Sequence, residues 1–178
     1  MIASIAYRGP DAQGAVMNGW AALAHARLSV IDPGHRSDQP MSDKRDELRI
    51  VFNGEIYNHN ELRHELLGKG HAFNTASDTE VLLHLYREYG PSMLPKLNGM
   101  FAFAIHDART DELFLARDRM GKKPLHYAEA NGTFVFGSEL KAVVAHPSIG
   151  DGIDPHALDQ YLTFEHVPAP RTIIQGVL

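Results

Sequence analysis

An asparagine–glycine pair ends an apolar run in IVFNGEIYN, residues 50–58. Asn-Gly between two strands is a strong hairpin signal, but the residues that follow have the pattern of a helix. The side-chain amide of Asn53 and the backbone N–H of Gly54 can donate two hydrogen bonds to one point, and glycine allows close approach of a ligand. Acyl-transfer sites hold an oxyanion with two such donors. The dipeptide alone favours the alternative, an ordinary surface turn.

Two charged residues could each bind an oppositely charged group of a ligand. Arg27 begins the segment RLSVID (27–32), which we expect to be a β-branched strand, and arginine suits bidentate binding of a carboxylate. Asp78 lies in SDTE (77–80), the expected start of a helix, where it could pair with an ammonium group. Taken singly, each residue is better explained without a ligand, Arg27 as a solvated edge arginine and Asp78 as an acidic residue that compensates the helix dipole.

Composition excludes several other classes of protein. The 178 residues contain no cysteine, which removes disulfides, thiolate metal sites and a thiol nucleophile, and the 11 histidines show no metal-ligand spacing. A net charge of −5 without a basic run provides no electrostatic footprint for nucleic acid or an anionic membrane. The longest apolar stretch, 100–105, is too short to span a bilayer. No signal-peptide pattern opens the sequence, so we expect a cytoplasmic protein.

Caps, stops and apolar patterns predict strands in runs, with helices grouped around them. Helices are expected at 58–68, 77–90, 138–146 and from 154 onward, with capping boxes at Asn58/Glu61 and Ser77/Glu80 and a cap at Asp154 before Pro155. Strands are expected at 50–53, 100–105, 113–117 and on both sides of Asn131-Gly132, a hairpin signal. Strand 100–105 is apolar on both faces and should be buried. The pattern indicates an α+β fold with mainly antiparallel sheets.

These features occur together, and in this order, in one known family. Nearly the whole chain resembles the glutaminase (class II glutamine amidotransferase) domain of asparagine synthetase. The resemblance rests on RGPD (8–11), RLSVID (27–32), QPM (39–41), FNGEIYN (52–58), SDTEVLLHLY (77–86), LNGMFAFAIHD (97–107), LFLARDR (113–119), GKKPLHY, SELKAV and QYLTFEHVPAPRT. RGPD favours the asparagine synthetase branch over the phosphosugar and phosphoribosyl amidotransferases.

The resemblance implies a four-layer αββα sandwich of the N-terminal-nucleophile hydrolase type, with glutamine as the ligand. Asn53 and Gly54 would form the oxyanion hole for the side-chain amide of glutamine. Arg27 would bind its α-carboxylate and Asp78 its α-ammonium, so we expect all four residues at one pocket. The backbone that frames this pocket would be that of Leu28, Ser29, Val30, Ile31 and Glu55.

The family's nucleophile is missing from this sequence. In the family it is an N-terminal cysteine whose own amine is the base, whereas this chain opens MIASIAYRGPDA. We therefore expect residues 1–150 to be an N-terminally incomplete glutaminase domain, inactive alone. Without the cysteine strand, the strands near 51–53 and 100–105 should expose unpaired edges, which favours aggregation or a homodimer.

Residues 151–178 are expected to be a final helix and a proline-punctuated linker toward an absent synthetase domain. That domain, rather than this one, would use ATP and Mg²⁺, and it would choose the ammonia acceptor, aspartate or a related carboxylate. Three hypotheses remain. The first is that the chain is a fragment of an asparagine synthetase-like amidotransferase. The second is that it is a glutamine-binding or scaffold module without a nucleophile. The third is a metal or phosphate enzyme, which no motif supports.

Overall fold

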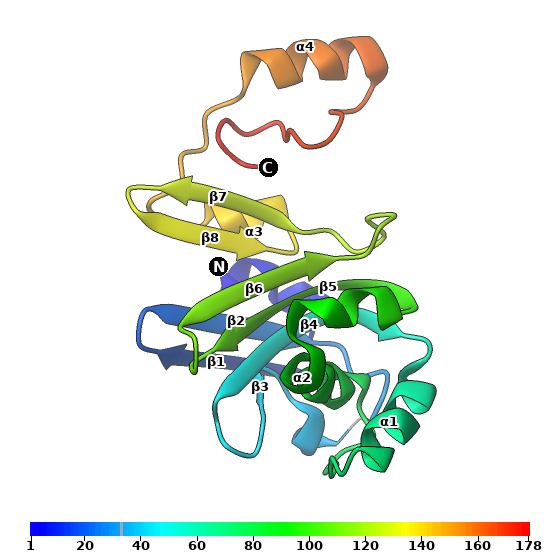
Figure 1. Cartoon of the computed structure of the whole chain (residues 1–178). Helices are drawn as coiled ribbons and strands as arrows, with labels where there is room; N and C mark the ends of the chain where they lie inside the picture. The colour runs from blue at the N-terminus through cyan, green and yellow to red at the C-terminus, as the bar shows by residue number, and fades with distance from the viewer. Residues whose placement is uncertain (33) are drawn as a thin grey trace. The chain divides into compact units, whose positions relative to one another are not determined.

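The computed structural model describes residues 1–32 and 34–178 of the chain. The chain divides into two compact units, one formed by residues 6–123 and the other by residues 1–5 together with 124–178. Each unit has its own hydrophobic cluster, and Figure 1 labels the elements of both.

Residues 6–123 fold into antiparallel sheets and helices. In chain order the elements are β1 (Ala12–Asn18), β2 (Ala21–Arg27), β3 (Met41–Ser42), β4 (Leu48–Ile56), α1 (His59–Gly68), α2 (Asp78–Tyr89), β5 (Gly99–Asp107) and β6 (Glu112–Arg117), with 3-10 turns at η2 (His35–Ser37) and η3 (Gly90–Lys96). A further 3-10 turn, η1 (Ile2–Arg8), begins in the other unit and ends in this one. One sheet has the order β3-β4-β5-β6 and the other is the ribbon β1-β2. β4 and β5 pair along their whole length, with Gly54 opposite Phe101.

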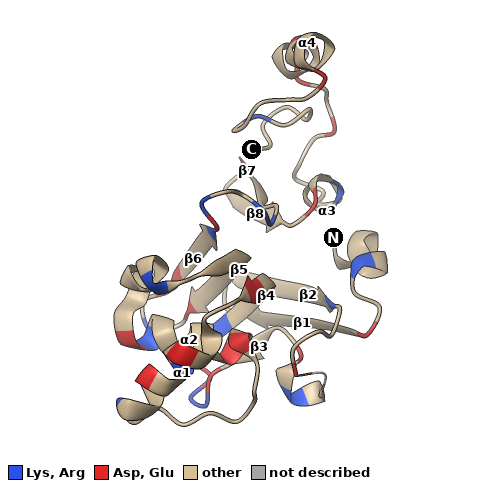
Figure 2. Cartoon of the chain, turned by 90° about the vertical axis from the view of Figure 1, so that its right-hand side faces the viewer, with Lys and Arg blue, Asp and Glu red and all other residues tan. Residues whose placement is uncertain are grey.

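This unit has three of the four expected layers. Helices α1 and α2 cover one face of the four-stranded sheet, and the β1-β2 ribbon lies on the other face (Figure 1); Figure 2 shows the same layers after a quarter turn. The ribbon is tied to the sheet by a hydrogen bond between His25 Nε2 and the Phe52 carbonyl, 3.0 Å long, and by an edge-to-face contact between the rings of Trp20 and His106.

The core lies between the sheet and the helices because alternate residues of a strand face the same side. The larger side chains of β4 and β5, such as Phe52, Phe103 and Ile105, are buried against Leu82 and Leu85 of α2. Ala102 and Ala104 on the opposite face are buried as well. The expectation that strand 100–105 is buried on both faces is therefore confirmed.

The helices begin and end close to where the sequence predicts, but their caps differ. Ser77 caps α2 by accepting the N–H of Thr79, whereas Glu80 accepts the N–H groups of Asn74 and Thr75 instead of closing a capping box. Asn58 caps α1 without a side-chain bond, because its amide binds the Lys96 carbonyl and the Asn98 N–H. Both proposed capping boxes are thus wrong in their side-chain contacts.

Two strand expectations are also wrong. Residues 28–32 are not a strand, because β2 ends at Arg27 and the following backbone turns its carbonyl groups toward that side chain. Strand 100–105 has no open edge, because β5 lies between β4 and β6. The edge of β4 that faces away from β5 pairs with β3 over two residues. Nearer the end of β4, side chains hydrogen-bond to the backbone groups of this edge.

In the second unit, β7 (His126–Ala130) and β8 (Thr133–Gly137) form the expected hairpin, with Asn131 and Gly132 at positive φ. The unit also holds α3 (Leu140–Val144) and α4 (Pro155–Phe164), which Asp154 caps as expected. The last residues do not run free: Val177 is buried and bridges to Ala128, and Leu178 bonds Tyr127 in both directions. The expected linker character of the tail does not extend to residues 177–178.

None of the helices in the described residues is both long and apolar enough to cross a membrane.

Candidate functional site

The edge of β4 that faces away from β5 is covered by side chains on both sides of Gly54. At Phe52, the backbone N–H donates to Gln39 Oε1 at 2.6 Å, and the carbonyl accepts from His25 Nε2 at 3.0 Å. At Ile56, the N–H donates to Asp78 Oδ2 at 3.0 Å. The Ile56 carbonyl accepts from a ring nitrogen of the histidine at position 59, 2.8 Å away.

Gly54 lies between these two covered positions. The backbone N–H of Tyr57 donates to the Asn98 carbonyl. Because alternate residues of an antiparallel strand bond to the same neighbour, the odd-numbered residues of β4 are those hydrogen-bonded to β5. The N–H and C=O of Gly54 therefore point to the other edge, between the bonded groups of residues 52 and 56. Among the residues that the structure describes, none hydrogen-bonds to either group of Gly54, nor to the half-buried side chain of Asn53 beside it. Two neighbouring donors are thus available to a ligand.

Only glycine fits at position 54. A Cβ atom there would lie 2.1 Å from the Met100 carbonyl oxygen and 2.8 Å from the Cα of Phe101, and φ is +155°. The close approach of two strand backbones, rather than a turn, therefore accounts for the Asn-Gly pair at the end of an apolar run. The alternative of an ordinary surface turn is wrong, because both residues lie within β4.

Arg27 is buried, with 6% of its surface exposed, at the end of β2. Its guanidinium Nη atoms donate to the loop that follows, namely to the carbonyls of Ile31 (3.3 Å), Asp32 (2.7 Å) and Gly34 (3.1 Å) and to Asp38 Oδ1 (2.7 Å). The Arg27 side chain thus holds the loop through both Nη atoms, and three of its four acceptors are neutral carbonyls. Asp38 is its one carboxylate partner among the described residues.

Asp32 connects this loop to the start of α2. Its Oδ2 atom accepts the Ala76 N–H and the Ser37 hydroxyl, each at 2.8 Å. These two bonds lower the pKa of the Asp32 carboxyl, with the Ala76 N–H as the largest cause. Arg27 bonds the backbone of Asp32, and Ala76 lies two residues before Asp78, so the two charged candidates are linked by one short chain of contacts.

Asp78 is buried at the first turn of α2, and burial raises the pKa of its carboxyl above the usual value. The N–H of Ile56 works in the opposite direction, because it stabilises the ionised form. The carboxylate therefore lies at the same edge of β4 as Gly54, two residues farther along the strand. The structure brings Asn53, Gly54 and Asp78 to one edge and ties Arg27 to it; whether they form a single pocket stays a prediction.

The segment between Arg27 and the loop is exposed rather than enclosed. Leu28 and Val30 are 60% and 74% exposed. The Ser29 N–H donates to Asp11 Oδ2 at 2.7 Å, and the Ile31 carbonyl accepts from Arg27. Glu55, on the other candidate segment, is half-buried.

The RGPD loop supports the same region. Gly9 packs so closely on the end of β2 that a Cβ atom would lie 2.1 Å from the Ala26 carbonyl carbon. The Asp11 N–H donates to the Arg27 carbonyl at 3.1 Å. This loop therefore fixes the backbone on which the arginine stands.

Sequence reasoning missed Gln39 and His25, which hold the two polar groups of Phe52. Burial lowers the pKa of His25 to about 4, so its ring is neutral and Nε2 carries the proton that the Phe52 carbonyl accepts. Nothing in the described part of the chain hydrogen-bonds to the other ring nitrogen. Gln39 lies in the QPM motif, the only signal that could have pointed to it; His25 carries no comparable signal beyond its place two residues before Arg27.

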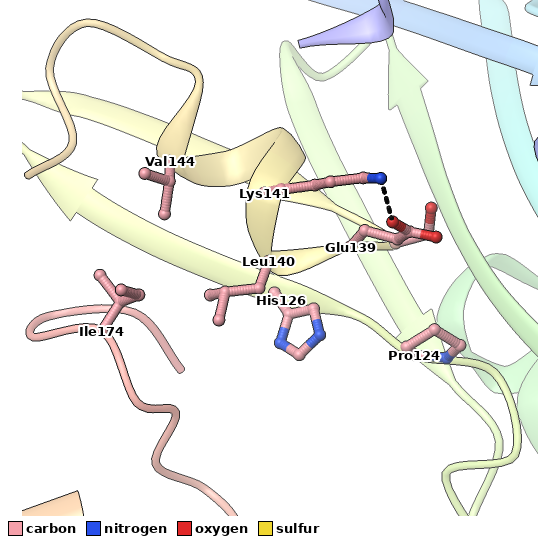
Figure 3. Close-up of a pocket in the computed structure, with 8 residues that line it drawn as sticks. Pro124, His126, Glu139, Leu140, Lys141, Val144 and Ile174 are labelled. Atoms are coloured by element: carbon pink, nitrogen blue, oxygen red, sulfur yellow. Dashed lines mark ion pairs between the residues drawn. The ribbon is translucent and has the colours of Figure 1, made fainter. Parts of the chain in front are cut away.

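A pocket of about 610 Å³ lies in the second unit. It is lined by Pro124, His126, Ser138, Glu139, Leu140, Lys141, Val144 and Ile174 (Figure 3). Its surface is mostly apolar, and Lys141 forms an ion pair with Glu139 at 3.5 Å. No candidate site residue lines it. No group of three or more His, Asp or Glu side chains in the described residues is arranged to hold a metal ion.

Comparison with known proteins gives consistent matches. The family described as "Glutamine amidotransferase domain" matches residues 1–178. Two proteins of Bacillus subtilis (strain 168) are similar: asparagine synthetase [glutamine-hydrolyzing] 3, 40% identical over 99% of this chain and 29% of that protein, and asparagine synthetase [glutamine-hydrolyzing] 1, 46% identical over 95% and 26%. Asparagine synthetase [glutamine-hydrolyzing] 1 of Arabidopsis thaliana is 43% identical over 77% and 23%. The chain thus spans less than a third of the length of these relatives.

Among solved structures, the chain is similar to glutamine phosphoribosylpyrophosphate amidotransferase from B. subtilis, with a TM-score of 0.59 and 30% identity over 69% of this chain and 29% of that one. The expected fold class is confirmed: the chain has the α+β fold of an N-terminal-nucleophile amidotransferase, with antiparallel sheets.

Proposed function

The chain belongs to the family of glutamine amidotransferase domains, and from this premise we propose that residues 6–123 bind L-glutamine at the edge of β4. The side-chain carbonyl of glutamine accepts from Gly54 N–H and from the Asn53 amide. The observation that carries this proposal is the gap at Gly54: the backbone groups two residues before and after it are bonded to side chains, and its own have no partner among the described residues. A primary amide has the acceptor and the donors that such a gap requires.

The two charged residues then bind the α-carbon end of glutamine. Asp78 pairs with the ammonium, which offsets the cost of burying an ionised carboxylate. Arg27 takes the α-carboxylate in exchange for Asp38, whose carboxylate now contacts its guanidinium. Asp38 thus stands where a substrate carboxylate would bind, and glutamine has to displace it.

We propose that the chain alone holds the amide without hydrolysing it. The 178 residues contain no cysteine, and oxyanion donors without a nucleophile leave only a residual rate enhancement. Resemblance to the family assigns the nucleophile to an N-terminal cysteine.

For the whole protein we propose a glutamine-hydrolysing, asparagine synthetase-like ligase in the cytoplasm, of which this chain is a fragment. Ammonia from glutamine would amidate aspartate or a related carboxylate in a synthetase domain that uses ATP and Mg²⁺. The names of the relatives support this assignment. A glutamine-binding or scaffold module without nucleophile is the second candidate, because the cysteine is missing from a chain that otherwise keeps the family's motifs.

A titration monitored by NMR tests the binding proposal. L-glutamine should shift the backbone amide of Gly54 in a saturable way, and Asn53→Ala or Asp78→Asn should weaken the binding. Glu61→Gln, an exposed acidic residue in the first turn of α1, is the matched control and should leave affinity unchanged.

An ammonia assay with the same protein should show no release above background. If Gly54 does not respond to L-glutamine, the site is misassigned. If ammonia is released and Asn53→Ala abolishes the release, the chain has a nucleophile that we have not recognised.

A further inference from the structure

Gln39 contacts two elements that carry opposite ends of the proposed glutamine site. Its side chain is buried, with 8% of the residue exposed. Oε1 accepts the Phe52 N–H of β4 at 2.6 Å, and Nε2 lies 3.4 Å from Thr79 Oγ1 in the first turn of α2. The amide therefore bridges a strand and a helix that are 27 positions apart in sequence at these two contacts.

The two contact points are next to the two groups that would bind the ligand. Phe52 is two residues before Gly54 on the same edge of β4, and Thr79 directly follows Asp78. A change in the length of this bridge would move the oxyanion donors relative to the carboxylate. The direct bond between Ile56 N–H and Asp78 fixes one side of the gap at Gly54, and Gln39 fixes the other.

We propose that Gln39 is a positioning residue that sets the distance between Gly54 and Asp78, and thereby selects a ligand of the length of L-glutamine over L-asparagine. This inference rests on the proposed function. L-asparagine carries the same amide, ammonium and carboxylate, but its chain is one methylene shorter. A site whose two ends are held apart rejects the shorter ligand, because it cannot reach both ends at once; a site whose ends can approach each other does not.

The ratio of the two affinities tests this role separately from stability. A single methylene is worth about 10- to 200-fold in discrimination, so the unchanged chain should bind L-glutamine at least about tenfold more tightly than L-asparagine. Thr79→Val keeps the side-chain volume but removes the hydroxyl that faces Nε2, and Gln39→Met removes both contacts. Both variants should reduce the ratio by about threefold or more, the size of one hydrogen bond.

Thr79→Ser is the control, since it keeps the hydroxyl, and its ratio should stay unchanged. Affinities are measured by calorimetry, and thermal unfolding of each variant reports stability. A variant that unfolds earlier but keeps the wild-type ratio shows that Gln39 only satisfies the Phe52 N–H, and this overturns the inference. If Gln39→Met does not fold, Thr79→Val decides.

Failure of the inference can be distinguished from failure of the proposed function. Binding of L-glutamine with an unchanged ratio in Thr79→Val overturns the positioning role and leaves the site assignment standing. Absence of L-glutamine binding by the unchanged chain overturns both.

Discussion

Replacement of Gly54 by alanine should destabilise the protein far more than a glycine-to-alanine change usually does. The new methyl group would lie 2.1 Å from the Met100 carbonyl oxygen, more than an ångström inside van der Waals contact. The clash is with backbone, which cannot move aside as a flexible side chain can. β4 and β5 would have to separate at this point, where both strands belong to the buried core.

The cost has two parts. The φ angle of +155° is unfavourable for alanine, and such backbone strain costs about 1–3 kcal/mol. Separation of the strands adds the loss of packing and ladder hydrogen bonds around the site, of similar size. We therefore expect a loss of about 3–5 kcal/mol in the free energy of unfolding, in the range that only specific mechanisms produce.

Two other glycines separate these contributions. Gly70 also has a positive φ, +90°, but nothing lies within 4 Å of a Cβ placed there, so Gly70→Ala should cost about 1–3 kcal/mol for strain alone. Gly68 ends α1 in open space, and Gly68→Ala should be neutral or stabilising by up to about 1 kcal/mol.

Urea unfolding of the three variants measures these differences through the shift of the midpoint at constant m-value. The expected order of stability is Gly68→Ala equal to or above wild type, then Gly70→Ala, and Gly54→Ala last. A loss for Gly54→Ala no larger than that for Gly70→Ala would refute the close approach of β4 and β5 as the reason for glycine at this position.

Three further predictions concern charge. Asp38→Asn should bind L-glutamine about 3- to 10-fold more tightly, because the ligand no longer displaces a carboxylate from Arg27. Asp46→Asn is the control, and an unchanged affinity in Asp38→Asn would count against the replacement of Asp38 by the α-carboxylate of glutamine. The raised pKa of the Asp78 carboxyl makes its ionised form unfavourable for folding, so the stability that this group contributes is lost as pH rises through the folded pKa. Asp78→Asn should therefore be more stable than wild type at pH 7 in urea unfolding, and it should no longer bind L-glutamine in calorimetry. Because the pKa of His25 is lowered from 6.5 to about 4 in the folded protein, the unfolded state binds more protons in this range. The free energy of unfolding should therefore fall by about 3 kcal/mol as the pH is lowered from 6.5 to 4, and this part of the pH dependence should be missing in His25→Gln.

Local signals were sufficient to predict most of the elements. The alternation of large residues with alanines predicts strand 100–105. Ser77 and Asp154 cap their helices at the positions that the sequence predicts. The hairpin at Asn131-Gly132 follows from two residues that tolerate positive φ. These signals depend on neighbours within a few positions, which is why they can be read from one sequence.

The supports of the candidate site could not be predicted in this way. Gln39 and Phe52 are 13 positions apart, and Asp32 and Ala76 are 44 apart. Each contact joins a side chain to a backbone N–H. Almost every residue type has the same backbone N–H, so the residue type of the partner does not indicate the contact. The expected strand at 27–32 failed for a related reason: its β-branched residues fit a strand, but the buried guanidinium of Arg27 draws the carbonyls of the next residues out of strand geometry.

The way in which the edge of β4 is closed explains why a small amide suits it better than another strand. An open strand edge is a template for pairing with a further chain, but pairing needs several consecutive free N–H and C=O groups. Here the groups of Phe52 and Ile56 are already bonded to side chains. Only Gly54, between them, is without a hydrogen-bond partner along this stretch of the described residues. Gly54 offers one donor and one acceptor about 3 Å apart. A primary amide can satisfy both with its own carbonyl and N–H, whereas a further strand could pair with this one residue only.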